Sequence, residues 1–574
     1  MATSVSPFPD VVTPPSGNVP PHAPRTAAAN APTAAKAPPP AAGTEQKPAF
    51  LDAAECAAWL ARVPLANVSL AQPMLLRQLN LLHRHELLPG ERAAILEALR
   101  RPVIEVQADA ANIFAGRPLP LAPPEQAALE RTLDLWRMLA QGYQRCFFSV
   151  CDEKIERSRN VPALRALLAQ RTLAAFADWQ VDLCRGEELP DAAYWQQLHR
   201  IFAAAERLGV ASVAVSDPVR HGATPTSALA AYAECNLLCT TSPYELPPRH
   251  MVWVARWARR WGAKLDLLTA PPEDIRNRAV PLWVDLESDR PPSYQPRQAS
   301  GGRWLETTEL RKSLIARITL LDQGRSPVDL QLGDDVTQPA ATLLLQRAQQ
   351  RWCKGGATRR QERQPADEEC SVITGLENVH FEFSGRVPFR APTRSDSTLR
   401  REREEFETFG NHSQRHGDAG NGKNAAHVEA WRVVDESASG LRLRRPHKEG
   451  ARVGPGQVVA VKIGNGQYYV VGNVRWVLRE GENSLVAGLQ LFPGEAKPAA
   501  IRAPDSSGSH SVWHQAFVLP AIPALKESAS LILPAGTFRL DRMIEVMSDQ
   551  KIASRKLFRV LDRGIEFERC NYYD

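Results

Sequence analysis

One segment near the C-terminal end constrains the fold more than any other part of the chain. It begins with a short valine-rich run, continues as D-x-S-x-x-G from Asp435 through Ser437 to Gly440, and ends in alternating apolar and basic residues. Because the side-chain period of a strand is two, Asp435 and Ser437 project to the same face. Gly440 permits a tight turn or bulge that other residues resist. The segment therefore predicts an acid and a hydroxyl beside a tight turn at the edge of a β-unit.

An arginine pair precedes this β-unit in the chain. Arg359 and Arg363 are spaced as R-x-x-x-R, with Arg360 between them. The run 370–374 follows, and its composition predicts a strand. Arginine presents a planar, permanently charged fork of donors that can address phosphate oxygens or guanine acceptors in pairs. The sequence therefore places a cationic arm directly before β-structure.

Three later runs also have the composition of strands. Residues 457–461 and 468–476 are expected to form two paired strands, and 487–491 to form a third. Together with the two motifs, these runs resemble the PilZ domains of bacterial receptors for cyclic di-GMP. The resemblance implies an antiparallel β-barrel with an arginine arm before its first strand.

The same resemblance implies a ligand and a set of binding residues. The ligand is cyclic di-GMP, and the resemblance implies no other cofactor, no metal ion and no catalytic residue. An aspartate can accept hydrogen bonds from guanine N–H groups, and a serine beside it can donate or accept. The implied ligand-binding residues are Arg359, Arg360, Arg363, Asp435, Ser437 and Gly440.

Two other segments have the arginine spacing of the arm. They are 386–390 and the overlapping 390–394, and both lie at the mouth of a polar stretch. The segment 359–363 is preferred because the PilZ arm leads directly into a strand. The spacing from Arg363 to Asp435 is longer than a compact barrel needs, and an insertion between the first strands would account for it.

The C-terminal half is therefore expected to be rich in strands. A PilZ-like barrel is assigned to 359–502, with a disordered insertion at 384–427, where small polar and charged residues dominate. Residues 511–574 contain further short β-like runs. These runs form either a second small β-domain or strands that complete an elaborated barrel.

The N-terminal half has a different pattern. Residues 1–48 are rich in proline and alanine and almost free of large apolar residues, so they are expected to be disordered. Apolar residues at the helical period predict a mainly helical domain over 50–310, either a bundle or an irregular solenoid, and a helical connector over 311–358. The fold class is thus α+β and multidomain, with an all-helical first domain.

A tryptophan stripe marks the segment 249–264. Trp253, Trp257 and Trp261 share one helical face, with arginines around them. A basic aromatic helix of this kind could contact nucleic acid or an anionic membrane surface. More often such a stripe is core, with arginine stems covering its rim, and this interpretation is preferred.

Composition restricts the class of protein and its compartment. The chain of 574 residues has room for three or four domains, and its net charge of +6 does not by itself indicate a nucleic-acid partner. No apolar run of about 18 residues predicts a membrane span, and the first residues lack the pattern of a signal peptide. Nine cysteines without a C-x-x-C pair are typical of reduced thiols. A cytoplasmic location is expected.

These observations favour a cyclic di-GMP effector that transmits ligand occupancy to a partner through its helical region. The alternative is a degenerate PilZ-like scaffold that binds protein partners without a nucleotide. An enzyme is not expected, because the sequence lacks P-loop, H-E-x-x-H, G-x-S-x-G and strand-linked G-x-G-x-x-G motifs. The sequence does not identify the protein partner, and motility, adhesion and exopolysaccharide machinery are all compatible with a receptor of this kind.

Overall fold

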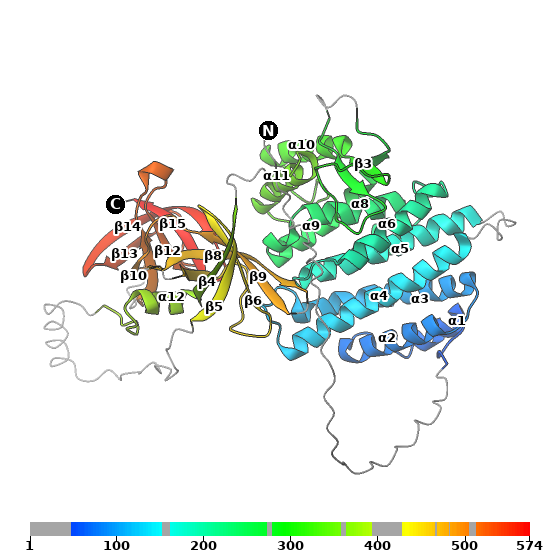
Figure 1. Ribbon diagram of the computed structural model, residues 1–574, viewed down its shortest axis with the longest axis horizontal. Coiled ribbons are helices and arrows are strands. Elements are labelled where there is room, and N and C mark those ends of the chain that lie inside the picture. Colours follow the sequence, from blue (N-terminus) through cyan, green and yellow to red (C-terminus); the bar gives the residue numbers. More distant parts are fainter. Residues whose placement is uncertain are drawn as a thin grey trace, which may run out of the picture.

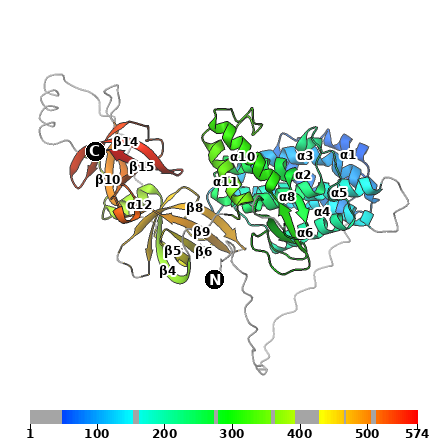
Figure 2. The same cartoon turned by 90° about the horizontal axis from the view of Figure 1, so that it is seen from above.

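The structure is a computed structural model. It describes residues 47–151, 161–272, 278–356, 363–392, 428–464, 466, 468–481, 483–503 and 512–573. Within these residues the chain forms a helical domain and two closed β-barrels. Figure 1 shows the three parts in a row, with the first barrel between the helical domain and the second barrel. Figure 2 shows the same order from above. The predicted α+β multidomain class is confirmed.

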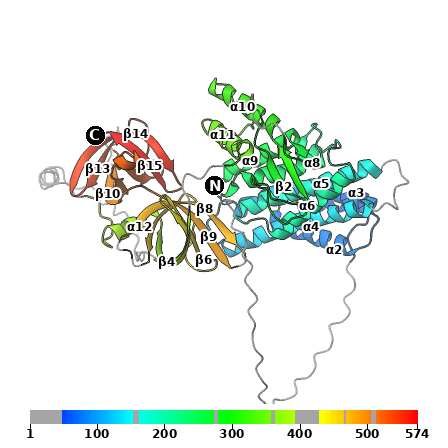
Figure 3. The same ribbon diagram turned by 45° about the horizontal axis from the view of Figure 1, so that its top comes forward.

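The helical domain is a bundle of helices whose apolar faces meet in one core. Its helices are α1 (Ala53–Leu60), α2 (Val68–Arg84), α3 (Pro89–Phe114), α4 (Pro123–Cys151), α5 (Val161–Arg185), α6 (Ala192–Arg207), α7 (Pro218–His221), α8 (Ala228–Thr240), η2 (Pro243–Glu245), α9 (Pro248–Trp261), η3 (Gly262–Lys264), α10 (Thr308–Asp322) and α11 (Ala340–Cys353). α5 packs against α4 and α8 and is buried along most of its length (Figure 3). Among the described residues, no helix combines the length and the apolar character needed to cross a bilayer.

A small antiparallel sheet interrupts the helices of the first domain. Its strands lie in the order β1 (Asp266–Leu268), β3 (Gly302–Glu306), β2 (Leu282–Asp285). Leu282 and Leu305 from this sheet are fully buried in the helical core. Strands of three to five residues have too few positions to display a period of two. The first domain is therefore mainly helical rather than all-helical.

α10 and α11 belong to the helical domain and do not form a separate connector. Leu310 and Leu314 of α10 are fully buried in its core. The Trp352 indole of α11 is also fully buried, and its Nε1 donates to the carbonyl oxygen of Leu237 in α8 at 2.8 Å. The structure thus differs from the predicted connector over 311–358, because these apolar side chains are covered by the rest of the bundle.

The tryptophan stripe of α9 is part of the core, as preferred from the sequence. Trp253, Trp257 and Trp261 are each 1 % exposed. The Trp257 Nε1 donates to the carbonyl oxygen of Leu332 at 2.9 Å. The Arg249 guanidinium lies 5.0 Å from the centroid of the Trp253 ring and covers the rim of the stripe.

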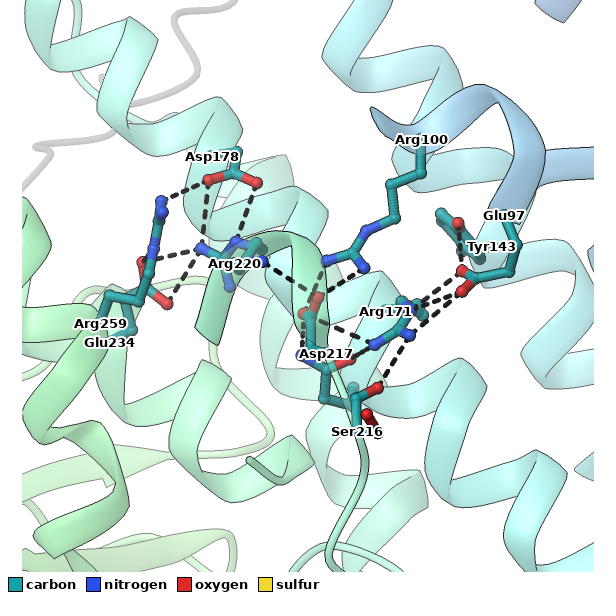
Figure 4. A network of polar contacts seen from close by, with 11 residues as sticks. Glu97, Arg100, Tyr143, Arg171, Asp178, Ser216, Asp217, Arg220, Glu234 and Arg259 are labelled. Atoms are coloured by element: carbon teal, nitrogen blue, oxygen red, sulfur yellow. Dashed lines mark hydrogen bonds and ion pairs between the residues drawn. The ribbon is translucent and has the colours of Figure 1, made fainter. Parts of the chain in front are cut away.

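A network of charged side chains crosses the helical core (Figure 4). Asp217 caps α7 and accepts two hydrogen bonds of 2.7 Å from Arg100 of α3. Arg171 of α5 pairs with Glu97 at 2.9 Å. The remaining members are Tyr143, Gln170, Asp178, Ser216, Arg220, Glu234 and Arg259. The network holds four arginines and four carboxylates, so its charges compensate one another, and its ion pairs tie the short helix α7 to α3 and α5.

The first barrel has the strand order β4-β5-β6-β9-β8-β7 and is closed because β4 pairs with both β5 and β7. Its strands are β4 (Gln364–Thr374), β5 (Glu429–Ser437), β6 (Gly440–Pro446), β7 (Val458–Ile463), β8 (Val470–Glu480) and β9 (Ser484–Leu491). Alternate residues such as Val372, Trp431 and Leu443 point inward and form its core. The strands predicted for the PilZ-like barrel all overlap strands of this barrel.

A helix, α12 (Leu376–Phe383), follows β4 and precedes the predicted insertion. Val379 of α12 shares an apolar cluster with Val458 of the first barrel and Phe517 of the second, so the helix packs between the two barrels. Most of the predicted insertion (393–427) and nearly all of the predicted disordered tail (1–46) lie outside the described residues.

The second barrel begins earlier in the chain than predicted. β10 (Lys497–Arg502) pairs with β11 and β13, so the polar stretch after Arg502 connects strands of one barrel. The predicted boundary at 502 therefore moves to the connection between β9 and β10. Of the two alternatives for 511–574, a second β-domain is the correct one. Its other strands are β11 (His514–Leu519), β12 (Ser530–Pro534), β13 (Met543–Ser548), β14 (Lys551–Arg563) and β15 (Phe567–Tyr573).

The connection between α3 and α4 closes one end of the first barrel. Leu119 in this connection is 3 % exposed and belongs to the apolar core of the barrel. It exchanges two backbone hydrogen bonds with Val453, of 2.7 and 2.8 Å. Arg452 adds an ion pair with Glu125 of α4 at 2.6 Å. The helical domain thus completes the core of the barrel.

Candidate ligand-binding site

The D-x-S-x-x-G segment forms the hairpin between β5 and β6. Ser437 pairs with Gly440 across a two-residue turn, and the Ser437 hydroxyl donates to the Gly440 carbonyl oxygen at 3.2 Å. A Cβ at Gly440 would lie 2.7 Å from the carbonyl oxygen of Leu489 on β9, which is too close for a side chain. Glycine is needed here because β9 approaches the turn so closely.

Arg363 lies immediately before β4 and next to this turn. The pairing of β4 with β5 places it beside Ser437. Its Nη1 donates to Oδ1 of Asp435, which is 72 residues later in the chain. The two side chains are 27 % and 21 % exposed, so the ion pair is accessible to a ligand.

The structure brings four of the six predicted binding residues together at the hairpin: Arg363, Asp435, Ser437 and Gly440. Arg359 and Arg360 lie outside the described residues. The contact of Arg363 with Asp435 favours the arm at 359–363 over its competitors.

The competing arginines lie in a different environment. Arg386 follows α12 and pairs with Glu382 of that helix at 3.0 Å. α12 follows the last residue of β4, whereas Asp435 pairs with Pro365 at the opposite end of that strand. Within the described ranges, neither Arg386 nor Arg390 forms a hydrogen bond or ion pair with the hairpin, and Arg394 is not among the described residues.

Three charged residues beside Asp435 were not singled out in the sequence. Arg442 is the cross-strand neighbour of Asp435, with Nη1 at 4.0 Å from Oδ2. Glu480 of β8 accepts from Arg442 at 3.1 Å and from Arg444 at 2.6 Å. The alternation of Gly440, Arg442 and Arg444 along β6 was the available signal, since residues two apart share a face of a strand.

An aromatic ring lies on the outer surface of the barrel beside Arg442. The Trp476 ring covers Gly488 of β9, where an added Cβ would lie 2.2 Å from a ring carbon. Gly488 is in turn the cross-strand partner of Arg442. Trp476 is partly exposed and offers a flat surface on which a base can stack. The site thus combines arginine guanidinium groups, a carboxylate that accepts hydrogen bonds and an aromatic surface. This combination suits a ligand with phosphates and purine rings.

Comparison with known protein families gives three matches in consecutive parts of the chain. Residues 54–273 match the N-terminal domain of the cyclic-di-GMP receptor FimW, and residues 282–432 match the middle PilZ domain of that receptor. Residues 499–574 match the FimW C-terminal beta-barrel domain. The three models belong to one family and together cover most of the chain. The chain belongs to the FimW family.

A curated relative supports the FimW assignment along the full architecture. The cyclic-di-GMP receptor FimW of Pseudomonas aeruginosa is 22 % identical over 548 residues, which cover 88 % of each chain. The resemblance to PilZ domains is therefore confirmed.

One of the three FimW matches agrees with an observed domain, and the middle match crosses a domain boundary. The C-terminal match begins within β10, in agreement with the start of the second barrel. The middle match extends from β2 into β5 and so includes α10 and α11 with the first part of the barrel. The middle match ends before Asp435. The hairpin is therefore assigned to the candidate site from its geometry.

Proposed function

We propose that the first barrel binds cyclic di-GMP at the hairpin between β5 and β6. The observation that carries this proposal is the ion pair of Arg363 with Asp435, because it joins the arginine motif to the D-x-S-x-x-G motif. Arg363, together with Arg359 and Arg360, supplies donor forks for phosphate oxygens or guanine acceptors. Asp435 accepts from guanine N–H groups, and Ser437 adds a hydroxyl beside it. The similarity to FimW, a cyclic-di-GMP receptor, supports the same ligand.

The protein acts as a receptor and has no catalytic role. Occupancy of the barrel is passed to a protein partner in the cytoplasm through the helical domain, which contacts the barrel directly. Leu119 in the barrel core and the ion pair of Arg452 with Glu125 support this route, because a shift of the barrel alters both contacts.

Titration calorimetry of the full chain with cyclic di-GMP tests the site. Replacing Arg363 with Ala is expected to weaken binding about tenfold or more, since a bidentate arginine contact contributes roughly 1–3 kcal/mol. Asp435→Ala is expected to have a similar effect. Arg386→Ala is the matched control, because it removes an arginine of the competing arm that pairs with Glu382.

Each outcome of this titration has one meaning. Weakened binding by Arg363→Ala with unchanged binding by Arg386→Ala supports the site. The reverse pattern would assign the ligand to the competing arm. No heat from the wild type at micromolar ligand would favour a scaffold that binds protein partners without a nucleotide. Melting temperatures of the ligand-free variants should stay close to the wild type.

A further inference from the structure

A row of arginines continues from the hairpin along the outer face of the first barrel. Arg442 and Arg444 follow Gly440 at alternate positions of β6 and therefore share its face. Asp435 contacts both Arg363 and Arg442, so the row is continuous with the proposed site. A ligand seated at Arg363 would lie beside this row.

Glu480 holds the two outer arginines in the absence of ligand. Its Oε1 accepts from Arg442 and its Oε2 from Arg444, so each carboxylate oxygen pairs with a different guanidinium. A phosphate group pairs with two arginines in the same way, through two of its oxygens.

We propose that Arg442 and Arg444 form a second anion-binding pair for the same ligand, and that Glu480 occupies this pair when the ligand is absent. The inference rests on the proposed binding of cyclic di-GMP at Arg363. A phosphate of the ligand displaces the Glu480 carboxylate from the two guanidiniums. The free energy of ligand binding then includes the gain from pairing the phosphate with the two arginines and the cost of breaking their ion pairs with Glu480. Glu480 therefore lowers the affinity for the ligand.

Titration of the full chain with cyclic di-GMP separates this role from a general effect of charge. Glu480→Gln keeps the shape of the side chain and removes the competing charge, so it is expected to tighten binding about threefold or more. Glu527→Gln is the matched control, because Glu527 pairs with Arg569 at 3.1 Å on the second barrel and carries the same charge. It should leave the affinity within about twofold. A gain in affinity cannot arise from damage to the fold.

The arginines are tested in the same assay. Arg442→Ala should weaken binding about tenfold. In the Arg442→Ala/Arg444→Ala background, Glu480→Gln should give no gain, because its competitors are gone. If Arg442→Ala lowers the melting temperature, Arg442→Gln replaces it, since the longer side chain still covers the strand.

Three results would overturn the inference. Equal gains from Glu480→Gln and Glu527→Gln would indicate long-range charge alone. Unchanged binding by Arg442→Ala, with binding weakened by Arg363→Ala, would remove the second pair and leave the proposed function intact. If the wild type does not bind cyclic di-GMP, both the second anion-binding pair and the proposed function are wrong.

Discussion

The guanidinium of Arg479, near the end of β8, lies 2.9 Å from the carboxylate of Glu188 in the connection between α5 and α6. The backbone N–H of Arg479 also donates to the carbonyl oxygen of Glu187 at 3.0 Å. β8 carries Trp476 and Glu480 on the candidate ligand face as well. One strand therefore connects the candidate site with the helical domain, and a displacement of β8 by ligand would reach the bundle directly.

Hydrogen exchange of the full chain with and without cyclic di-GMP tests this connection. Ligand is expected to slow exchange in β8 and to change it around 186–188, because the two segments share hydrogen bonds. Exchange should also change in α11, which leads into the arginine arm. A ligand shifts such an equilibrium only by its differential affinity for the two states.

Glu188→Gln serves as the control for this experiment. It weakens the contact with Arg479 and should reduce the change in the helical domain while leaving the affinity for ligand within about twofold. Slowing that is confined to the barrel in the wild type would mean that the two domains are merely tethered.

Glu187→Gln is expected to stabilise the protein at neutral pH. Burial raises the pKa of Glu187 well above its ordinary value, and its Oε2 has no hydrogen-bond partner among the described residues. Because the folded-state pKa is raised, the folded protein loses stability as pH rises from about 4.3 toward that pKa. The variant should melt about 2 °C or more above the wild type at pH 7.5, and the difference should vanish near pH 4. An equal gain at both pH values would contradict this assignment.

Asp217→Asn is expected to destabilise the helical domain by about 3–5 kcal/mol, because it leaves Arg100 buried without its counter-charge and removes one of the two carboxylates beside Arg171. Burial alone raises the pKa of Asp217, but hydrogen bonds from Arg100 and the surrounding arginines outweigh it and hold the pKa well below its usual range. The ionised carboxylate therefore stabilises the fold above about pH 4, and this contribution is lost as pH falls below that value.

Thermal unfolding between pH 7 and pH 3 checks this prediction. The difference in melting temperature between the wild type and Asp217→Asn should become smaller as the pH falls below about 4. Asp134→Asn is the control, since Asp134 pairs with Arg137 on the exposed surface of α4 and its loss should change little. A difference in melting temperature that stays constant with pH would mean that Asp217 is not the titrating group.

Deletion of residues 393–424 tests the predicted insertion. The segment is polar and glycine-rich, and it joins the end of α12 to β5. Because the entropy of loop closure varies slowly with loop length, the shortened protein should remain folded and bind ligand within about threefold of the wild type. Soluble yield and calorimetry measure both properties. Loss of soluble protein would show that the segment packs as part of the fold.

Local patterns predicted the parts of the fold that depend on neighbours in the chain. The strand around Asp435 and Ser437 and the stripe from Trp253 to Trp261 were found because their periods are visible within a few residues. The arrangement of Arg363 beside Asp435 was reached only through the resemblance to PilZ domains, since spacing alone does not determine which distant strands pair.

Features that depend on closure of the barrels were not found in the sequence. Glu480 and Arg442 are 38 positions apart in the chain. They meet because the barrel places β6 and β8 on the two sides of β9. The polar stretch after Arg502 resembles a linker, yet it joins two strands of one barrel, and composition does not distinguish a linker from a loop. α10 and α11 pack against side chains from distant parts of the helical domain. The sequence of the two helices alone does not show which residues cover them.

The place of Leu119 inside the first barrel has a consequence for how this receptor could evolve. A barrel moved alone into another protein would leave behind the side chain that fills one of its ends and would expose an apolar hollow lined by residues such as Val453 and Val474. The barrel is therefore not a portable module. Recombination that separates it from the connection between α3 and α4 would be selected against, so the helical and sensory parts are expected to be inherited as one unit.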